Sequence, residues 1–122
     1  ARPIEPKGFD DVIRSIASGQ IEEITGPAIG LCDAIITKSP GQLTFPIMKR
    51  LCGPGIVVTN AEAKAAMRIA FERLKLVAEP GGSVALAAAL YHGDKIKGDS
   101  VIAVISGGNV DADLFAQVLG EN

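Results

Sequence analysis

The chain has 122 residues, 48% hydrophobic and 21% charged, so we expect one globular domain with a buried core and exclude a disordered chain. Twelve Lys and Arg residues against 14 Asp and Glu residues give a net charge of −2, which excludes a basic surface for nucleic acid. The longest apolar run, Val84–Tyr91, is far shorter than the roughly 20 residues that cross a bilayer, so we expect no membrane partner either.

Short elements and one long connection make up the amino-terminal half. Val12, Ile13 and Ile16 recur at helical spacing, and Gly19 follows where a glycine commonly caps a helix C-terminus. The pattern then weakens until Pro40, and a structureless stretch of that length is usually functional. In chain order we predict a strand end at Arg2–Glu5, a helix over Phe9–Ser18, a connection over 20–40 and a helix over Leu43–Leu51.

The middle of the chain contains the clearest helix signal. Ile56-Val57-Val58 has the character of a short buried strand, and Thr59 and Glu62 then form a Thr-x-x-Glu capping box. Apolar residues at intervals of three and four predict a helix from this box to Pro80. The next segment, Ser83–Tyr91, is almost entirely apolar and predicts a helix that is buried on all sides.

The strongest strand signal lies near the carboxyl terminus. Ser100–Ile105 is a continuous apolar run, which is typical of a parallel strand covered by helices on both faces. A helix is predicted from about Asp111, so strands and helices alternate and the fold class is α/β. Three strands are few for a freestanding parallel sheet, and we therefore expect part of a larger domain.

Three candidate binding features follow from this layout. In α/β sheets, ligands bind beyond the carboxyl ends of the strands, where Ser106-Gly107-Gly108-Asn109 lies. The glycines let backbone amides approach a ligand, although an ordinary turn has the same composition. Glu79 precedes the glycines of a helix start and could equally be a simple cap. Glu5, Asp10 and Asp11 could ligate a hard cation through oxygen or form solvated surface.

Two cysteines and one histidine limit the other kinds of chemistry. Cys32 and Cys52 are 20 positions apart and in no Cys-x-x-Cys motif, which predicts two reduced core thiols in a cytoplasmic protein. The single histidine, His92, excludes a multi-His metal site built within this chain.

Four segments, in order, carry a resemblance to a known family: Ile4–Asp11, Gly41–Ile47, Arg73–Ala88 and Val104–Asp111. The series resembles the carboxyl-terminal part of the serine/threonine dehydratases, including serine racemase. The resemblance implies a pyridoxal-phosphate (PLP) enzyme of fold type II. Its architecture would be α/β, a three-layer parallel sheet of the tryptophan-synthase β-like class. Residues 1–122 would form a single piece, the carboxyl-terminal portion of the large, PLP-binding catalytic domain.

The resemblance also assigns roles to individual residues. Ser106 resembles the serine that hydrogen-bonds the pyridine nitrogen of the cofactor, with Gly107 beside it, and Glu79 resembles a glutamate next to the active site. Ala34 matches a position near the cofactor ring where relatives more often carry Gly.

A divalent-cation site is implied as well. Glu5, the backbone carbonyl of Phe9 and Asp11 resemble the Mg or Mn site of the serine racemase-like members. Relatives often have Ala where Phe9 stands, and the larger ring could alter this loop.

The family's Schiff-base lysine and glycine-rich phosphate loop have no counterpart here, so the fragment contains no catalytic residue and the chain alone is expected to be inactive. The resemblance implies a lyase that converts L-threonine or L-serine to a 2-oxo acid and ammonia. The small-molecule substrate and the missing amino-terminal segment would be its partners, and we expect a homo-oligomer. The alternatives are an amino-acid racemase or hydroxyaspartate dehydratase on the same fold, or a non-catalytic α/β module that binds a ligand or partner.

Overall fold

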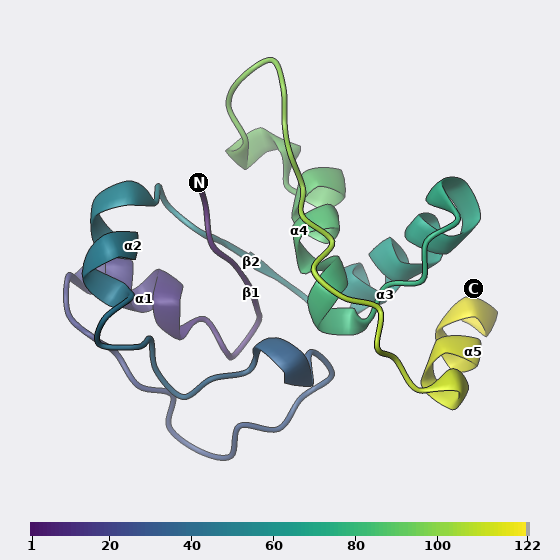
Figure 1. Ribbon diagram of the computed structural model, residues 1–122, viewed down its shortest axis with the longest axis horizontal. Helices are drawn as coiled ribbons and strands as arrows, with labels where there is room; N and C mark the ends of the chain where they lie inside the picture. Colours follow the sequence, from purple (N-terminus) through teal and green to yellow (C-terminus); the bar gives the residue numbers. More distant parts are fainter. Residues whose placement is uncertain (122) are drawn as a thin grey trace.

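A two-stranded parallel sheet lies at the centre of the computed structural model, which describes residues 1–121 (Figure 1). Strand β1 (Ile4–Pro6) pairs with β2 (Ile56–Val58), with Ile4 opposite Ile56 and Pro6 opposite Val58. Helices α1 (Asp11–Ser18) and α2 (Phe45–Leu51) lie on one side of the strands, and α3 (Asn60–Ile69) and α4 (Pro80–Tyr91) on the other. This arrangement is the helix–sheet–helix layering expected of an α/β domain.

The helix-end signals of the sequence are confirmed at two places. Gly19 ends α1 in the left-handed conformation, at φ 79°, and its amide donates to the Ser15 carbonyl over 2.9 Å. At the start of α3, the Glu62 amide donates to Thr59 Oγ1 over 3.2 Å. The Thr59 amide donates to Glu62 Oε2 over 2.6 Å in return, which completes the capping box.

The helix after the capping box ends earlier than predicted. A π-helical turn, η2 (Ala70–Leu74), follows α3 directly, and Lys75 then adopts a left-handed conformation at φ 60°. A residue in that region cannot continue a right-handed helix, so the expected extension to Pro80 is wrong. The extended stretch that replaces it carries exposed Leu76 and Val77 toward the start of α4.

Helix α4 starts three residues before the predicted Ser83, because proline is tolerated in the first turn of a helix. Its beginning is buried from Pro80 to Val84, whereas Leu90 and Tyr91 at its end are exposed. The expectation of a helix buried on all sides is therefore wrong at its carboxyl-terminal end, although Ala87 and Ala88 are still buried.

The predicted strand over Ser100–Ile105 is also wrong in this structure. The segment contains no ladder hydrogen bond within the described residues, and Val101, Ile102 and Val104 are exposed by 52%, 92% and 65%. A strand requires a neighbour to accept and donate its backbone hydrogen bonds, and no other described segment pairs with this one.

The remaining elements confirm or refine the prediction. Helix α5 (Ala112–Gly120) starts after Asp111, as expected. Its C-terminus is held on α3 by an ion pair of 2.6 Å between Lys64 and Glu121 and by hydrogen bonds from the Arg68 guanidinium to the carbonyls of Val118 and Glu121. Two short 3₁₀ turns, η1 (Asp33–Ile35) and η3 (Gly93–Lys95), complete the chain.

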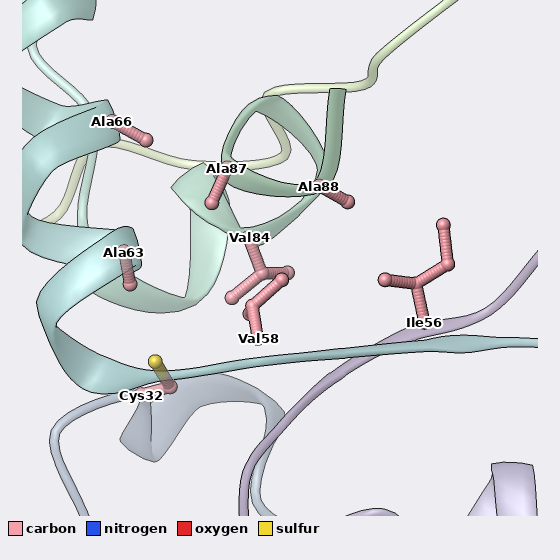
Figure 2. Close-up of a cluster of buried hydrophobic side chains, with 8 residues drawn as sticks. All are labelled: Cys32, Ile56, Val58, Ala63, Ala66, Val84, Ala87 and Ala88. Carbon is pink, nitrogen blue, oxygen red and sulfur yellow. The ribbon is translucent and has the colours of Figure 1, made fainter. Parts of the chain in front are cut away.

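The core joins β2, α3 and α4 around small side chains (Figure 2). Its buried members are Cys32, Ile56, Val58, Ala63, Ala66, Val84, Ala87 and Ala88. Cys32 is 1% exposed, and burial, together with the negative charge of Asp33, raises the pKa of its thiol to about 11. Both cysteines are free, but Cys52 is only half-buried, so a single core thiol replaces the two that were predicted.

Candidate active site

The start of α4 and the segment Ser106–Gly108 are in direct backbone contact. The amide of Glu79 donates to the Gly107 carbonyl over 3.0 Å, and the amide of Ser106 donates to the Gly82 carbonyl over 3.3 Å. These two bonds fix Ser106 beside the first turn of α4. The predicted residues Glu79, Ser106 and Gly107 are thus brought into one site.

Glycine is required at two positions of this contact, Gly82 and Gly108, and a third glycine, Gly107, packs against a side chain. A Cβ atom on Gly82 would collide with the backbone of Gly107, and one on Gly108 would collide with the Val77 carbonyl. On Gly107, the same atom would collide with the carboxylate of Glu79, which lies against this residue. At Gly82 and Gly108 the two chain segments therefore meet backbone to backbone, and the Ser106 hydroxyl and the Glu79 carboxylate lie beside this contact.

Ala34 lies on the neighbouring wall. It belongs to η1, which packs against the start of α4, so that a Cβ on Gly81 would be 3.5 Å from Ala34 Cβ and 3.3 Å from Ile35 Cγ1. Ala34 itself is exposed, and its amide donates to Asp33 Oδ1 over 2.9 Å. All four residues assigned to the cofactor thus gather around the N-terminus of α4.

A groove of about 690 Å³ opens next to this point. One wall consists of small residues of α4, including Ala85, Ala88 and Ala89, and the floor includes Ile4 and Ile56 of the two strands. The opposite wall is the extended segment 100–104, and Ser106 lies at the end of that wall. Apolar side chains predominate in the groove, Arg2, Glu5 and Lys97 add charged groups, and Ser106 adds a neutral hydroxyl to its rim.

A second set of predicted residues joins the end of β1 to the start of α1. Glu5 accepts hydrogen bonds from the amides of Val12 and Ile13 at 3.2 and 2.8 Å. Asp11 is fully buried; its Oδ2 accepts from Thr37 Oγ1 over 3.3 Å, whereas its Oδ1 has no hydrogen-bond partner within residues 1–121. An unpaired buried carboxylate oxygen is unusual, and a water molecule or a cation would satisfy it.

Burial is the largest influence on the pKa values of both carboxylates, Glu5 and Asp11. It raises the pKa of Glu5 from 4.5 to about 7, against the opposing effect of the amides of Ile13 and Val12, and the charges of Asp11 and Asp10 raise it further. Burial also raises the pKa of Asp11, while its own amide and the Thr37 hydroxyl lower it. A bound cation would stabilise the ionised forms that burial disfavours.

The side chain of Phe9 does not intrude into this set. Its ring lies beside Gly30, where an added Cβ would be 3.0 Å from Phe9 Cε2. The bulk at this position is therefore accommodated by a glycine in the long connection, and the Phe9 carbonyl stays on the loop between Glu5 and Asp11. No cluster of three or more His, Cys, Asp or Glu side chains suited to a metal occurs among residues 1–121, so any cation here would need this carbonyl or water as well.

Two residues of the second set were not found from the sequence. Thr37 is 26 positions from its partner Asp11, and Gly30 lies in a segment without periodic pattern. Neither has a local signal, because both contacts depend on how the connection over 20–40 folds back on α1.

No helix among the described residues is long and apolar enough to cross a membrane.

Comparison with known proteins identifies similar sequences and structures. Residues 3–107 match the family described as "Pyridoxal-phosphate dependent enzyme". The chain is 42% identical over 118 residues to a serine racemase of Dictyostelium discoideum, covering 94% of this chain and 36% of that protein. It is 34% identical over 116 residues to an L-threo-3-hydroxyaspartate ammonia-lyase of Pseudomonas sp, covering 95% of this chain and 36% of the relative.

A solved structure agrees with these matches. A threonine deaminase from T.th. superposes with a TM-score of 0.83 at 35% identity, over 88% of this chain and 36% of that chain. The present chain therefore spans about 36% of the length of these similar proteins.

Proposed function

Because this chain belongs to the pyridoxal-phosphate dependent enzymes, we propose that it is the carboxyl-terminal part of the cofactor-binding domain of a serine/threonine dehydratase. The fold expected from the sequence is confirmed: the structural neighbours are fold type II PLP enzymes, and this α/β chain with its parallel strands corresponds to part of their large domain. The reaction proposed for the whole enzyme removes water and then ammonia from L-serine or L-threonine and leaves a 2-oxo acid.

The observation that carries this proposal is the glycine contact that places Ser106 and Glu79 at the start of α4. The two segments pack directly on each other there, and room for a planar ring lies in the adjoining groove of about 690 Å³ that Ser106 lines. The Ser106 hydroxyl would face the ring nitrogen, Gly107 would allow close approach, Glu79 would lie beside the ring, and Ala34 would form a wall. When bound, pyridoxal phosphate supplies an electron sink for the substrate.

The neutral character of Ser106 favours elimination. A hydroxyl can donate a hydrogen bond to an unprotonated ring nitrogen, whereas a carboxylate would hold a proton there and strengthen the sink. A weaker sink suits the expulsion of a β-hydroxyl from the substrate. The residue at position 106 is thus proposed to influence which reaction the cofactor performs.

We place a divalent cation at Glu5, the Phe9 carbonyl and Asp11. The unpaired Oδ1 of buried Asp11 supports this assignment, and an all-oxygen set suits Mg²⁺ or Mn²⁺. Glu5 retains free lone pairs beyond the two amide hydrogen bonds that it accepts. The cation would connect β1 to the start of α1, beside the groove that Glu5 also lines.

A second candidate function is racemisation of serine. It is favoured by the 42% identity to the Dictyostelium serine racemase, and it would use the same position of Ser106. The hydroxyaspartate ammonia-lyase of Pseudomonas sp supports a third substrate, 3-hydroxyaspartate, for the same elimination.

The test is an assay of the intact enzyme that contains this chain, loaded with pyridoxal phosphate. L-Serine, L-threonine and 3-hydroxyaspartate are supplied in turn, the 2-oxo acid is measured with a coupled dehydrogenase, and D-serine is measured by chiral chromatography. A 2-oxo acid from serine or threonine as the main product supports the dehydratase. If D-serine is the main product, the racemase proposal replaces the dehydratase proposal. If neither product is formed, both proposals are contradicted.

Variants of position 106 test the site itself. Ser106→Ala removes one neutral hydrogen bond, about 0.5–1.5 kcal/mol, and should weaken cofactor binding by roughly two- to tenfold. Ser106→Asp should slow elimination more strongly, because it favours a proton on the ring nitrogen. Ser100→Ala, another exposed serine that lines the groove, is the matched control and should change neither value. An Asp variant with unchanged turnover would contradict the assigned position of Ser106.

A further inference from the structure

Two adjacent residues of the long connection, Ile36 and Thr37, contact the residues assigned to the cation. The hydroxyl of Thr37 donates to Asp11 Oδ2 over 3.3 Å. Ile36 lies against the same glycine as the Phe9 ring: an added Cβ on Gly30 would be 2.8 Å from Ile36 Cδ1 and 3.0 Å from Phe9 Cε2. The connection therefore reaches one proposed ligand through a hydrogen bond and another through apolar packing.

The two preceding residues, Ala34 and Ile35, lie on the cofactor side instead. Both belong to η1 and pack on the first turn of α4, where a Cβ on Gly81 would be 3.5 Å from Ala34 Cβ and 3.3 Å from Ile35 Cγ1. Ile35 and Thr37 also line the same groove. The short segment 34–37 thus contacts the proposed cation ligands at one end and forms the proposed wall of the cofactor site at the other.

The Thr37 hydroxyl fixes which oxygen of Asp11 is left for a cation. Asp11 is fully buried, its Oδ2 accepts from Thr37, and its Oδ1 has no hydrogen-bond partner within residues 1–121. Without the Thr37 bond, the carboxylate would be free to turn about its Cβ–Cγ bond. Carboxylates that ligate metals are commonly held by an outer hydrogen bond of this kind, and loss of such a partner weakens metal affinity by roughly 10- to 100-fold.

The backbone on both sides of the segment is anchored. Cys32, before η1, is buried in the core, and after Thr37 the amide of Ile24 donates to the Lys38 carbonyl over 2.8 Å. Within residues 1–121, no side-chain hydrogen bond other than that of Thr37 connects 33–38 to a helix or strand. The bond to Asp11 is therefore the polar link between the cation loop and η1.

We propose that Thr37 is a positioning residue, which holds Asp11 for the cation and couples the occupied cation site to η1, the wall beside the cofactor. This inference rests on the cation site proposed above. A bound cation would fix Asp11, Asp11 would restrain Thr37, and Thr37 would hold the segment 34–37 against α4. By linkage, the ordered segment favours cation binding to the same extent.

The experiment uses the intact enzyme that contains this chain, loaded with pyridoxal phosphate and freed of metal with a chelator. The Kd of Mn²⁺ is measured from the electron paramagnetic resonance of the free ion. Amide hydrogen exchange of the segment 34–37 is measured by mass spectrometry, with and without saturating Mg²⁺. In the unaltered enzyme we expect Mg²⁺ to slow this exchange. Neither readout requires turnover.

Two substitutions of Thr37 isolate its hydroxyl. Thr37→Val keeps the shape of the side chain without the hydroxyl; it should weaken Mn²⁺ binding at least about tenfold and abolish the effect of Mg²⁺ on exchange. Thr37→Ser retains the hydroxyl and should behave like the unaltered enzyme. The matched control is Thr44→Val, at another exposed threonine, which lies outside the groove and donates to the Gly41 carbonyl over 3.1 Å. It should change neither readout, and circular dichroism checks that each variant retains the fold.

Asp11→Asn separates this inference from the cation site on which it rests. If Asp11→Asn leaves Mn²⁺ binding unchanged, the cation site and the role of Thr37 are both wrong. If Asp11→Asn removes binding but Thr37→Val binds Mn²⁺ as tightly as the unaltered enzyme, the cation site stands and the role of Thr37 is overturned. It is also overturned if Thr37→Ser binds as weakly as Thr37→Val, or if Mg²⁺ slows exchange equally in the Val variant.

Discussion

Glu5 is expected to make the stability of this chain fall as pH rises. Burial raises the pKa of its carboxyl from 4.5 to about 7 in the folded state. The unfolded chain therefore releases this proton first, and the stability that protonated Glu5 provides is full below pH 4.5 and lost as pH rises through about 7. At 1.36 kcal/mol per pKa unit the shift corresponds to about 3 kcal/mol. Because Glu5 also lines the open groove, water reduces this value, and we expect about 2 kcal/mol.

The measurement is urea unfolding across this pH range, in the presence of a chelator. Glu5→Gln cannot ionise, so most of the decline should disappear; a smaller decline remains, because burial also raises the pKa of Asp11. Glu23→Gln, at an exposed carboxylate, is the control and should follow the unaltered chain. Two results would refute this reasoning. One is an unaltered chain that becomes more stable between pH 4.5 and about 7, and the other is a Glu5→Gln variant whose unfolding free energy falls as much as that of the unaltered chain.

Four further predictions test other parts of the structure. Near pH 8, Mg²⁺ at about 100 times its Kd should stabilise the chain by about 2.7 kcal/mol in thermal unfolding; the site is rejected if chelation and Asp11→Asn both change nothing. Gly82→Ala should destabilise by about 1–3 kcal/mol and speed amide exchange at Ser106, whereas Gly93→Ala, with open space around it, should be tolerated; equal effects would contradict the close contact. Ser83→Ala removes the hydrogen bonds of 3.1 and 2.8 Å that the buried Ser83 hydroxyl donates to the carbonyls of Ala63 and Pro80, and it should lower the unfolding free energy measured in urea by about 1 kcal/mol. No change would show that the hydroxyl is solvated. Thr59→Ala should cost about 1 kcal/mol in the same assay, and a neutral result would show that the capping box contributes nothing.

Signals that lie within a few residues of one another were sufficient to predict structure. The capping box at Thr59 and the glycine after α1 depend only on neighbouring backbone groups, and both were found where the sequence indicates. The left-handed Lys75 was not predictable, because the apolar periodicity of the helix continues through Leu74 and Val77. The extended stretch that follows contacts Gly108 through the Val77 carbonyl, and a contact between such distant positions has no local signature.

In the candidate site, too, local sequence signals were predictable and contacts between distant residues were not. The motif around Ser106 and the glutamate at position 79 indicated residues near a binding site, but only the fold shows that Gly82 and Gly107 meet. The prediction of a strand over 100–105 was wrong for a different reason. Its sequence encodes a preference for a central position in a parallel sheet, and the neighbouring strands needed to satisfy that preference are absent from residues 1–121.

The pairing of β1 with β2 has a consequence for the order of folding. Ile4 and Ile56 are joined across 52 positions, whereas α3 and α4 contact each other through residues such as Ala63 and Ser83, only 20 positions apart. Closing the longer loop costs more conformational entropy before any contact offsets it. The α3–α4 hairpin is therefore expected to form first and to provide the surface on which the two strands meet. Early amide protection in α3 and α4, ahead of β1, is the kinetic signature of this order.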